Sequence, residues 1–185
     1  AASHYKQAIS VLRRYADSRA CAIFLRHAGD LQRSLKEYDQ SERMLLEAQS
    51  FAHAGGHQDV EQRCALSLVR WKHEMERDAG QRPDIRSLII ELNTIADYVR
   101  RMEMPSLSCD VMVAHAEMLI EDGESSQSGR LMSRAMTLSK RNGMTLRLTT
   151  ALVRYAHVLA LRGLKPQSNR LLFYALDMAK RSRNQ

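Results

Sequence analysis

Three cysteines, Cys21, Cys64 and Cys109, are the residues here that could bind a metal or act as nucleophiles, because a thiolate does both. They lie 43 and 45 residues apart, close to the internal repeat described below, and none belongs to a Cys-x-x-Cys pair. One position recurring in stacked repeats would place the thiols roughly 10 Å apart, far beyond a Zn–S distance of about 2.3 Å. We therefore predict three small buried hydrophobes near the starts of helices, and no metal or other cofactor.

Two histidines, His53 and His57, have the H-x3-H spacing that can share a zinc ion within one helical turn. The intervening Gly55-Gly56 breaks the helix and no fourth ligand is evident, so a solvated loop is the better interpretation. His73-Glu74 and His115-Ala116-Glu117 each lack the second histidine of an HExxH zinc site. Phosphate-binding GxxxxGKS or GxxxxGKT, dinucleotide-binding GxGxxG and nucleophile-elbow GxSxG motifs do not occur in the chain. We predict that the protein is not an enzyme.

The composition predicts an all-helical protein. Hydrophobic residues make up 44% of the 185 residues and charged residues 26%, which is too apolar for a disordered chain. Aromatic residues (5%), prolines (3) and glycines (8) are too few for a β-sandwich or barrel, whereas the abundant Ala, Leu, Met, Arg, Glu and Gln favour helices. No apolar run approaches the roughly 18 residues of a membrane span, and no signal-peptide core is present.

The cysteine content and the N-terminus give two further expectations. An odd number of cysteines without a Cys-x-x-Cys pair suits a reducing compartment, so we expect an intracellular protein, cytoplasmic or nuclear. The chain begins with Ala1-Ala2 and has no initiator methionine, so we expect the cut edge of a longer chain.

A Gln-Ser-x-Arg motif occurs three times, at residues 40–43, 127–130 and 167–170. Two apolar residues follow each copy, and a small or apolar residue then recurs at intervals of four, as at Ala48 and Ala52. The 87-residue gap between the first two copies predicts a degenerate copy near its middle, and Leu88, Leu92 and Ala96 reproduce the spacing. Stripes of this kind allow close packing of neighbouring helices.

The spacing predicts helices over residues 4–15, 18–35, 40–53, 58–78, 84–102, 107–121, 126–141, 146–162 and 166–182. These form four helix-turn-helix units at 18–53, 58–102, 107–141 and 146–182, with 4–15 as the tail of a preceding unit. The predicted fold is all-α: one module of stacked hairpins in a right-handed superhelix, with a period of 40–44 residues, cut from a longer solenoid.

The pattern Leu25, Ala28-Gly29, Ser41, Leu45 and Ala48 resembles the tetratricopeptide repeat consensus, although that family has a period of 34. The stretch from Ala116-Glu117 through Ala135-Met136-Thr137-Leu138-Ser139-Lys140, Ala156, Gly163, Gln167 and Leu171-Leu172 to Ala175 is also similar to the C-terminal repeats of the family of subunit 5 of the anaphase-promoting complex. That resemblance covers roughly the last 70 residues, and its identities fall mostly on generic core positions, so convergence explains it equally well. It implies a scaffold module of a ubiquitin-ligase platform without catalytic residues of its own.

Charge is distributed unevenly along the chain. Residues 1–124 carry a net charge of −4, whereas residues 125–185 hold twelve Lys or Arg and the single acid Asp177, a net charge of +11. Arg130 and Arg170 occupy the same repeat position, which predicts a basic stripe. We expect the charge-recognition residues to be these: Arg147, Arg154, Arg162, Lys165, Arg130 and Arg170.

Three functions remain open on the sequence. The preferred one is a protein-interaction scaffold in a multi-subunit complex, which binds an acidic or phosphorylated peptide or a sister subunit. Nucleic acid is a second possible partner, although only Tyr155, Phe173 and Tyr174 are available in the basic region for stacking on bases. The third is the ligand-sensing domain of a larger regulator. Self-association is open.

Overall fold

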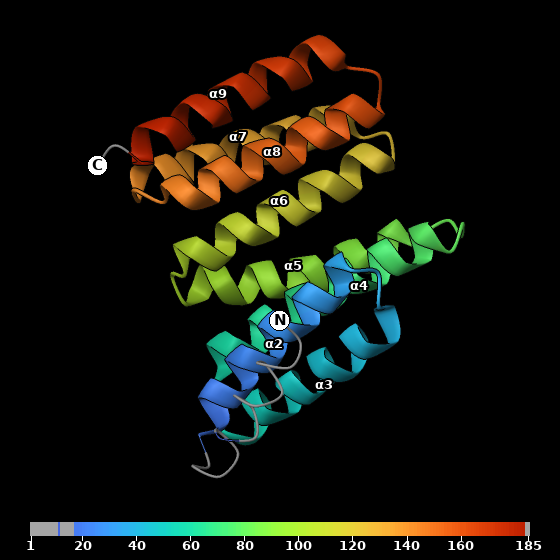
Figure 1. The fold of residues 1–185 in the computed structure, drawn as a ribbon, viewed down its shortest axis with the longest axis vertical. Coiled ribbons are helices and arrows are strands. Elements are labelled where there is room, and N and C mark those ends of the chain that lie inside the picture. The colour runs from blue at the N-terminus through green and yellow to red at the C-terminus, as the bar shows by residue number, and fades with distance from the viewer. Residues whose placement is uncertain (1–10, 12–16, 184–185) are drawn as a thin grey trace. The chain divides into compact units, whose positions relative to one another are not determined.

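The computed structural model describes residue 11 and residues 17–183, and within that part every regular element is a helix. Their bounds are α2 Ser18–Ser34, α3 Tyr38–Ala54, α4 Gln58–Asp78, α5 Ile85–Arg101, α6 Pro105–Glu121, α7 Ser125–Arg141, α8 Thr145–Leu161 and α9 Lys165–Arg183 (Figure 1). Each bound lies within two residues of its prediction. The predicted helix 4–15 lies outside the described residues.

The chain divides into two compact units, residues 1–84 and 85–185, and each is described by itself. In the first unit α2, α3 and α4 pack against one another. In the second unit each helix from α5 to α9 packs on the next, and α6 also packs on α8. The division falls inside the predicted repeat at 58–102, so the single module stays a prediction.

The helices end in one recurring way. Each connection contains a residue with positive φ, such as Gly123 and Gly163 (φ 94° and 77°), and the following N–H bonds back to the last turn. For example, the N–H of Leu164 donates to the carbonyl oxygen of Leu159 at 2.9 Å, which is a Schellman ending. Six of the eight helices have 17 residues, but α4 has 21. The longer α4 and the connection after it explain why the period is 40 in one part of the chain and 43 or more in another.

The serine of the Gln-Ser-x-Arg motif has a structural role. Ser41, Ser128 and Ser168 are buried, and each hydroxyl donates to the carbonyl oxygen of the residue 12 positions earlier, at 2.9, 2.7 and 2.7 Å. The acceptors, Gly29, Ala116 and Ala156, lie on the first helix of the same hairpin. Because these acceptors have no side chain or only a methyl group, the two backbones approach closely enough for the bond.

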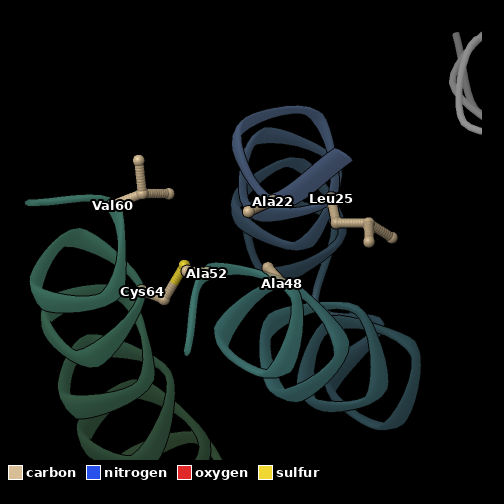
Figure 2. Close-up of a cluster of buried hydrophobic side chains, with 6 residues drawn as sticks. All are labelled: Ala22, Leu25, Ala48, Ala52, Val60 and Cys64. Atoms are coloured by element: carbon tan, nitrogen blue, oxygen red, sulfur yellow. The ribbon is translucent and has the colours of Figure 1, made fainter. Parts of the chain in front are cut away.

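In the first unit, small residues hold three helices together (Figure 2). Ala48 and Ala52 of α3 lie between α2 and α4, and Cys64 of α4 packs against this cluster with no exposed surface. Cys21 and Cys109 are likewise buried and free, which confirms that the cysteines are small core residues.

Burial raises the pKa of the Cys64 thiol to about 12. Because alkylation requires the thiolate, we expect the native protein to resist iodoacetamide at neutral pH at Cys21, Cys64 and Cys109. All three should be labelled after denaturation, and intact-mass spectrometry would count the adducts. Rapid labelling of native Cys64 would contradict this assignment.

The degenerate copy in α5 has a different register from the predicted one. Its buried residues include four with spacings of four, three and four, namely Leu88, Leu92, Ile95 and Val99. The same spacings separate the buried residues of α7, which are Ser128, Met132, Ala135 and Ser139. Leu88 therefore takes the place of the serine, and the prediction that Ala96 is the counterpart of Ala52 is wrong. Ala96 is only partly buried, and bulky side chains at Ile95 and Val99 disguise the true register.

Two histidines make stability depend on pH. Burial lowers the pKa of His115 below its ordinary 6.5, and burial together with Arg26 lowers that of His27. The unfolded chain then binds protons more tightly, so the free energy of unfolding falls as pH drops through the unfolded pKa towards the folded one. We expect denaturant titrations between about pH 7 and pH 5 to show a shallower fall for His115→Gln than for the parent chain. Equal slopes would contradict the role of His115.

Candidate partner-binding surface

Three of the six predicted recognition residues face a neighbouring helix. Arg154 on α8 donates from Nε to Oε1 of Glu117 on α6 at 2.6 Å, and Glu117 is buried. Arg147, one face lower on α8, forms an ion pair with Asp110 of α6. Arg162 donates from Nη2 to the carbonyl oxygen of Ile120. These side chains join the first helices of successive hairpins, and much of their charge is used within the fold.

The first unit contains the same kind of link. Arg19 of α2 holds Asp59 of α4 with two hydrogen bonds, at 2.8 and 2.6 Å, and this contact lowers the pKa of the Asp59 carboxyl. Arg33 of α2 forms an ion pair with Glu74 of α4. Pairs between first helices, 37 to 41 residues apart, are therefore a repeated device that stabilises the stack.

The other predicted residues, Arg130, Lys165 and Arg170, are exposed. Within residues 17–183 they form no ion pair or side-chain hydrogen bond. Arg43, Arg130 and Arg170 are the arginines of the three Gln-Ser-x-Arg motifs, and all three are exposed, so the motif presents a cation while its serine is buried. The cations of the second unit that have no partner there are Arg130, Arg134, Lys140, Lys165, Arg170 and Lys180. We call this set the free basic surface.

An open cavity of about 410 Å³ lies beside Arg170. Its walls are mainly apolar and come from α6, α8, α9 and the turn before α9, with Tyr155, Leu159 and Leu171 among them. Ser125, Gln167 and Arg170 contribute the polar lining. The cavity can therefore take an apolar group that carries a hydrogen-bonding or anionic end.

The sites considered for metal chemistry have other contacts. His53 Nδ1 lies 3.2 Å from Glu61 Oε1, and His57 Nε2 lies 3.1 Å from Ser18 Oγ. Among the described residues, no group of three or more His, Cys, Asp or Glu side chains could hold a metal ion. None of the helices in that part of the chain is long and apolar enough to cross a membrane.

The sequence did not indicate which basic residues are paired. Arg147 and Arg154 lie seven residues apart on one face of α8, and Asp110 and Glu117 lie seven apart on α6. Matching acidic and basic residues at an offset of 37 would have found both pairs. The cavity gave no comparable signal, because its walls come from four segments.

Comparison with known proteins supports the fold. No protein-family model matches the chain, and neither does any curated protein. Among solved structures it is similar to a signal transduction ATPase with numerous domains from Pyrococcus horikoshii, which has a tetratricopeptide repeat sensor. The TM-score is 0.63 at 13% identity, and the match covers 97% of this chain and 28% of that one. The fold is therefore all-α and of the tetratricopeptide-like kind.

Proposed function

We propose that this chain is a protein-interaction module that binds an acidic partner through the free basic surface of its second unit. Tetratricopeptide-like repeats generally bind other proteins, and their stacked hairpins offer extended surfaces for this. The observation that carries the proposal is the cation at a fixed repeat position, which is exposed at Arg130 and Arg170 while its neighbouring serine is buried. Catalysis forms no part of the proposal. Membership of a multi-subunit complex rests on the resemblance to the anaphase-promoting complex subunit alone.

The test is an affinity capture from extract of the source cells with Arg130→Glu/Arg170→Glu. Arg43→Glu/Arg86→Glu is the matched control, because it reverses two exposed arginines elsewhere and changes the net charge equally. We expect the specific partners to be lost with the first variant and kept with the second. Equal recovery with both variants would contradict the proposal. Binding of arbitrary DNA with a steep salt dependence would instead indicate a nucleic-acid partner.

A sensor domain is the second candidate, favoured by the cavity beside Arg170. Its volume of about 410 Å³ lies in the range of small-molecule sites, and the similar archaeal protein carries its repeats as a sensor. The lining suits an apolar carboxylate. A panel of medium-chain carboxylic acids should raise the melting temperature of the parent chain by mass action. Leu171→Trp, which fills the cavity, should abolish that rise, and no rise in the parent chain would remove this candidate.

A further inference from the structure

Helix α9 carries an apolar stripe on the face that points away from α8. Its residues are Leu172, Phe173 and Leu176, with 41%, 73% and 51% of their surfaces exposed. Ala175 and Leu171 of the same helix pack towards Leu148, Leu152 and Leu159 of α8. In Figure 1, α9 (red) lies at one edge of the second unit. We call the three exposed residues the outer apolar stripe.

The same positions are covered in α7, one repeat earlier. Met132 and Met136 lie 40 residues before Leu172 and Leu176, and Met132 is only 2% exposed. Both methionines pack in a cluster with Ala151 of α8, the first helix of the next hairpin. The repeat therefore uses these positions to hold a following helix, and within residues 17–183 the outer apolar stripe has none.

The first unit contains a second example of this interface. Leu45 of α3, the counterpart of Leu172, is fully buried, and Ala48 and Ala52 on the same stripe pack with Val60 and Cys64 of α4. The chain thus builds this contact twice with a helix as the occupant. The outer apolar stripe continues that interface, so its natural occupant is also a helix with one apolar face.

Charge selects among helices. Lys165, Arg170 and Lys180 of α9 have no ion pair within the described part of the chain, and the single acid, Asp177, is paired with Arg181 at 2.8 Å. A second copy docking through its own α9 would bring like charges together, which disfavours a symmetric dimer. A helix with acidic residues beside its apolar face would instead meet opposite charge.

We propose that the outer apolar stripe docks an amphipathic helix of a partner protein, with acidic residues flanking the helix's apolar face. This deepens the proposed function and rests on it, because it names the class of partner and the contact that adds apolar burial to charge attraction. Leu172 and Leu176 are one helical turn apart and contact residues of the partner at intervals of three and four.

The probe is a labelled peptide with the sequence of α6, residues 105–121, with Cys109→Ser. This segment is a first helix of this chain, and it holds three acids, Asp110, Glu117 and Glu121, without Lys or Arg. The comparison peptide has the sequence of α8, residues 145–161, which carries only Arg147 and Arg154 as charged residues. Fluorescence anisotropy measures the binding of each peptide to the whole chain.

We expect the α6 peptide to bind more tightly than the α8 peptide, and Leu172→Ser/Leu176→Ser to weaken it by about tenfold or more. Leu46→Ser/Leu146→Ser is the control, because it removes two other exposed leucines and should leave binding unchanged. Both pairs are exposed, so unchanged circular dichroism should accompany either variant.

Three outcomes would overturn the inference: no binding of the α6 peptide, equal binding of the α8 peptide, or equal effects of the two double variants. Self-association of the parent chain that Leu172→Ser/Leu176→Ser abolishes would make a second copy the occupant, and would also overturn it. The proposed function fails separately, when Arg130→Glu/Arg170→Glu captures the same partners as Arg43→Glu/Arg86→Glu.

Discussion

Replacing Arg154 with glutamate should lower the free energy of unfolding by about 3–5 kcal/mol. The change removes the cation that pairs with Glu117 at 2.6 Å and places a second carboxylate beside it. Glu117 is buried, so it cannot recover the lost interaction by binding water. Chemical denaturation followed by circular dichroism would measure the loss.

A charge exchange separates this pair from other effects of the substitution. Arg154→Glu combined with Glu117→Arg restores the attraction in reverse and should recover much of the stability, which a double-mutant cycle quantifies. Arg170→Glu is the matched control, and because it is exposed its effect should stay within about 0.5 kcal/mol. If Arg154→Glu and Arg170→Glu are equally stable, the link between α6 and α8 contributes nothing. Charge reversal at Arg154 consequently tests the fold and is a poor probe of recognition.

Leu152→Ala should also destabilise the second unit, by about 2–5 kcal/mol. Leu152 has no exposed surface and lies in a cluster with Leu148 and Ala175, between α8 and α9. Truncation leaves a cavity that the surrounding helices fill only in part. The measurement is again the free energy of unfolding in denaturant.

Leu146→Ala makes the same chemical change on the same helix at a residue that is 81% exposed. It should alter the free energy of unfolding by no more than about 0.5 kcal/mol. A loss as large as that of Leu152→Ala would show that the buried face of α8 is assigned wrongly.

The helices were predictable because each has a narrow stripe and a defined end. The stripe formed by Ser128, Met132 and Ala135 and the stop at Asn142-Gly143 are local signals, and the observed α7 agrees with both. In α5 the stripe is equally regular but consists of large residues, so the small-residue pattern misplaced it by a turn. Local patterns therefore determined where helices lie, and side-chain size limited the register.

The candidate site was predictable only in part. A count of charges correctly located the excess of arginine and lysine in residues 125–185, because composition needs no geometry. It could not distinguish Arg154, which faces Glu117, from Arg170, which faces solvent, because pairing depends on which helices adjoin. The exposed leucines of α9 had the same ambiguity, since their repeat counterparts in α3 and α7 are buried.

The uniform spacing of the turns bears on how such a chain can lengthen. The residues with positive φ at 103, 123, 143 and 163 are 20 residues apart, and the serine bond spans the same 12 positions in every copy. A segment of 40 residues beginning at any of these turns contains its own hairpin, its own internal bond and a complete surface for the next copy. Duplication of such a segment in frame would join like ends to like ends, so the gene could grow by whole hairpins without creating a mismatched junction.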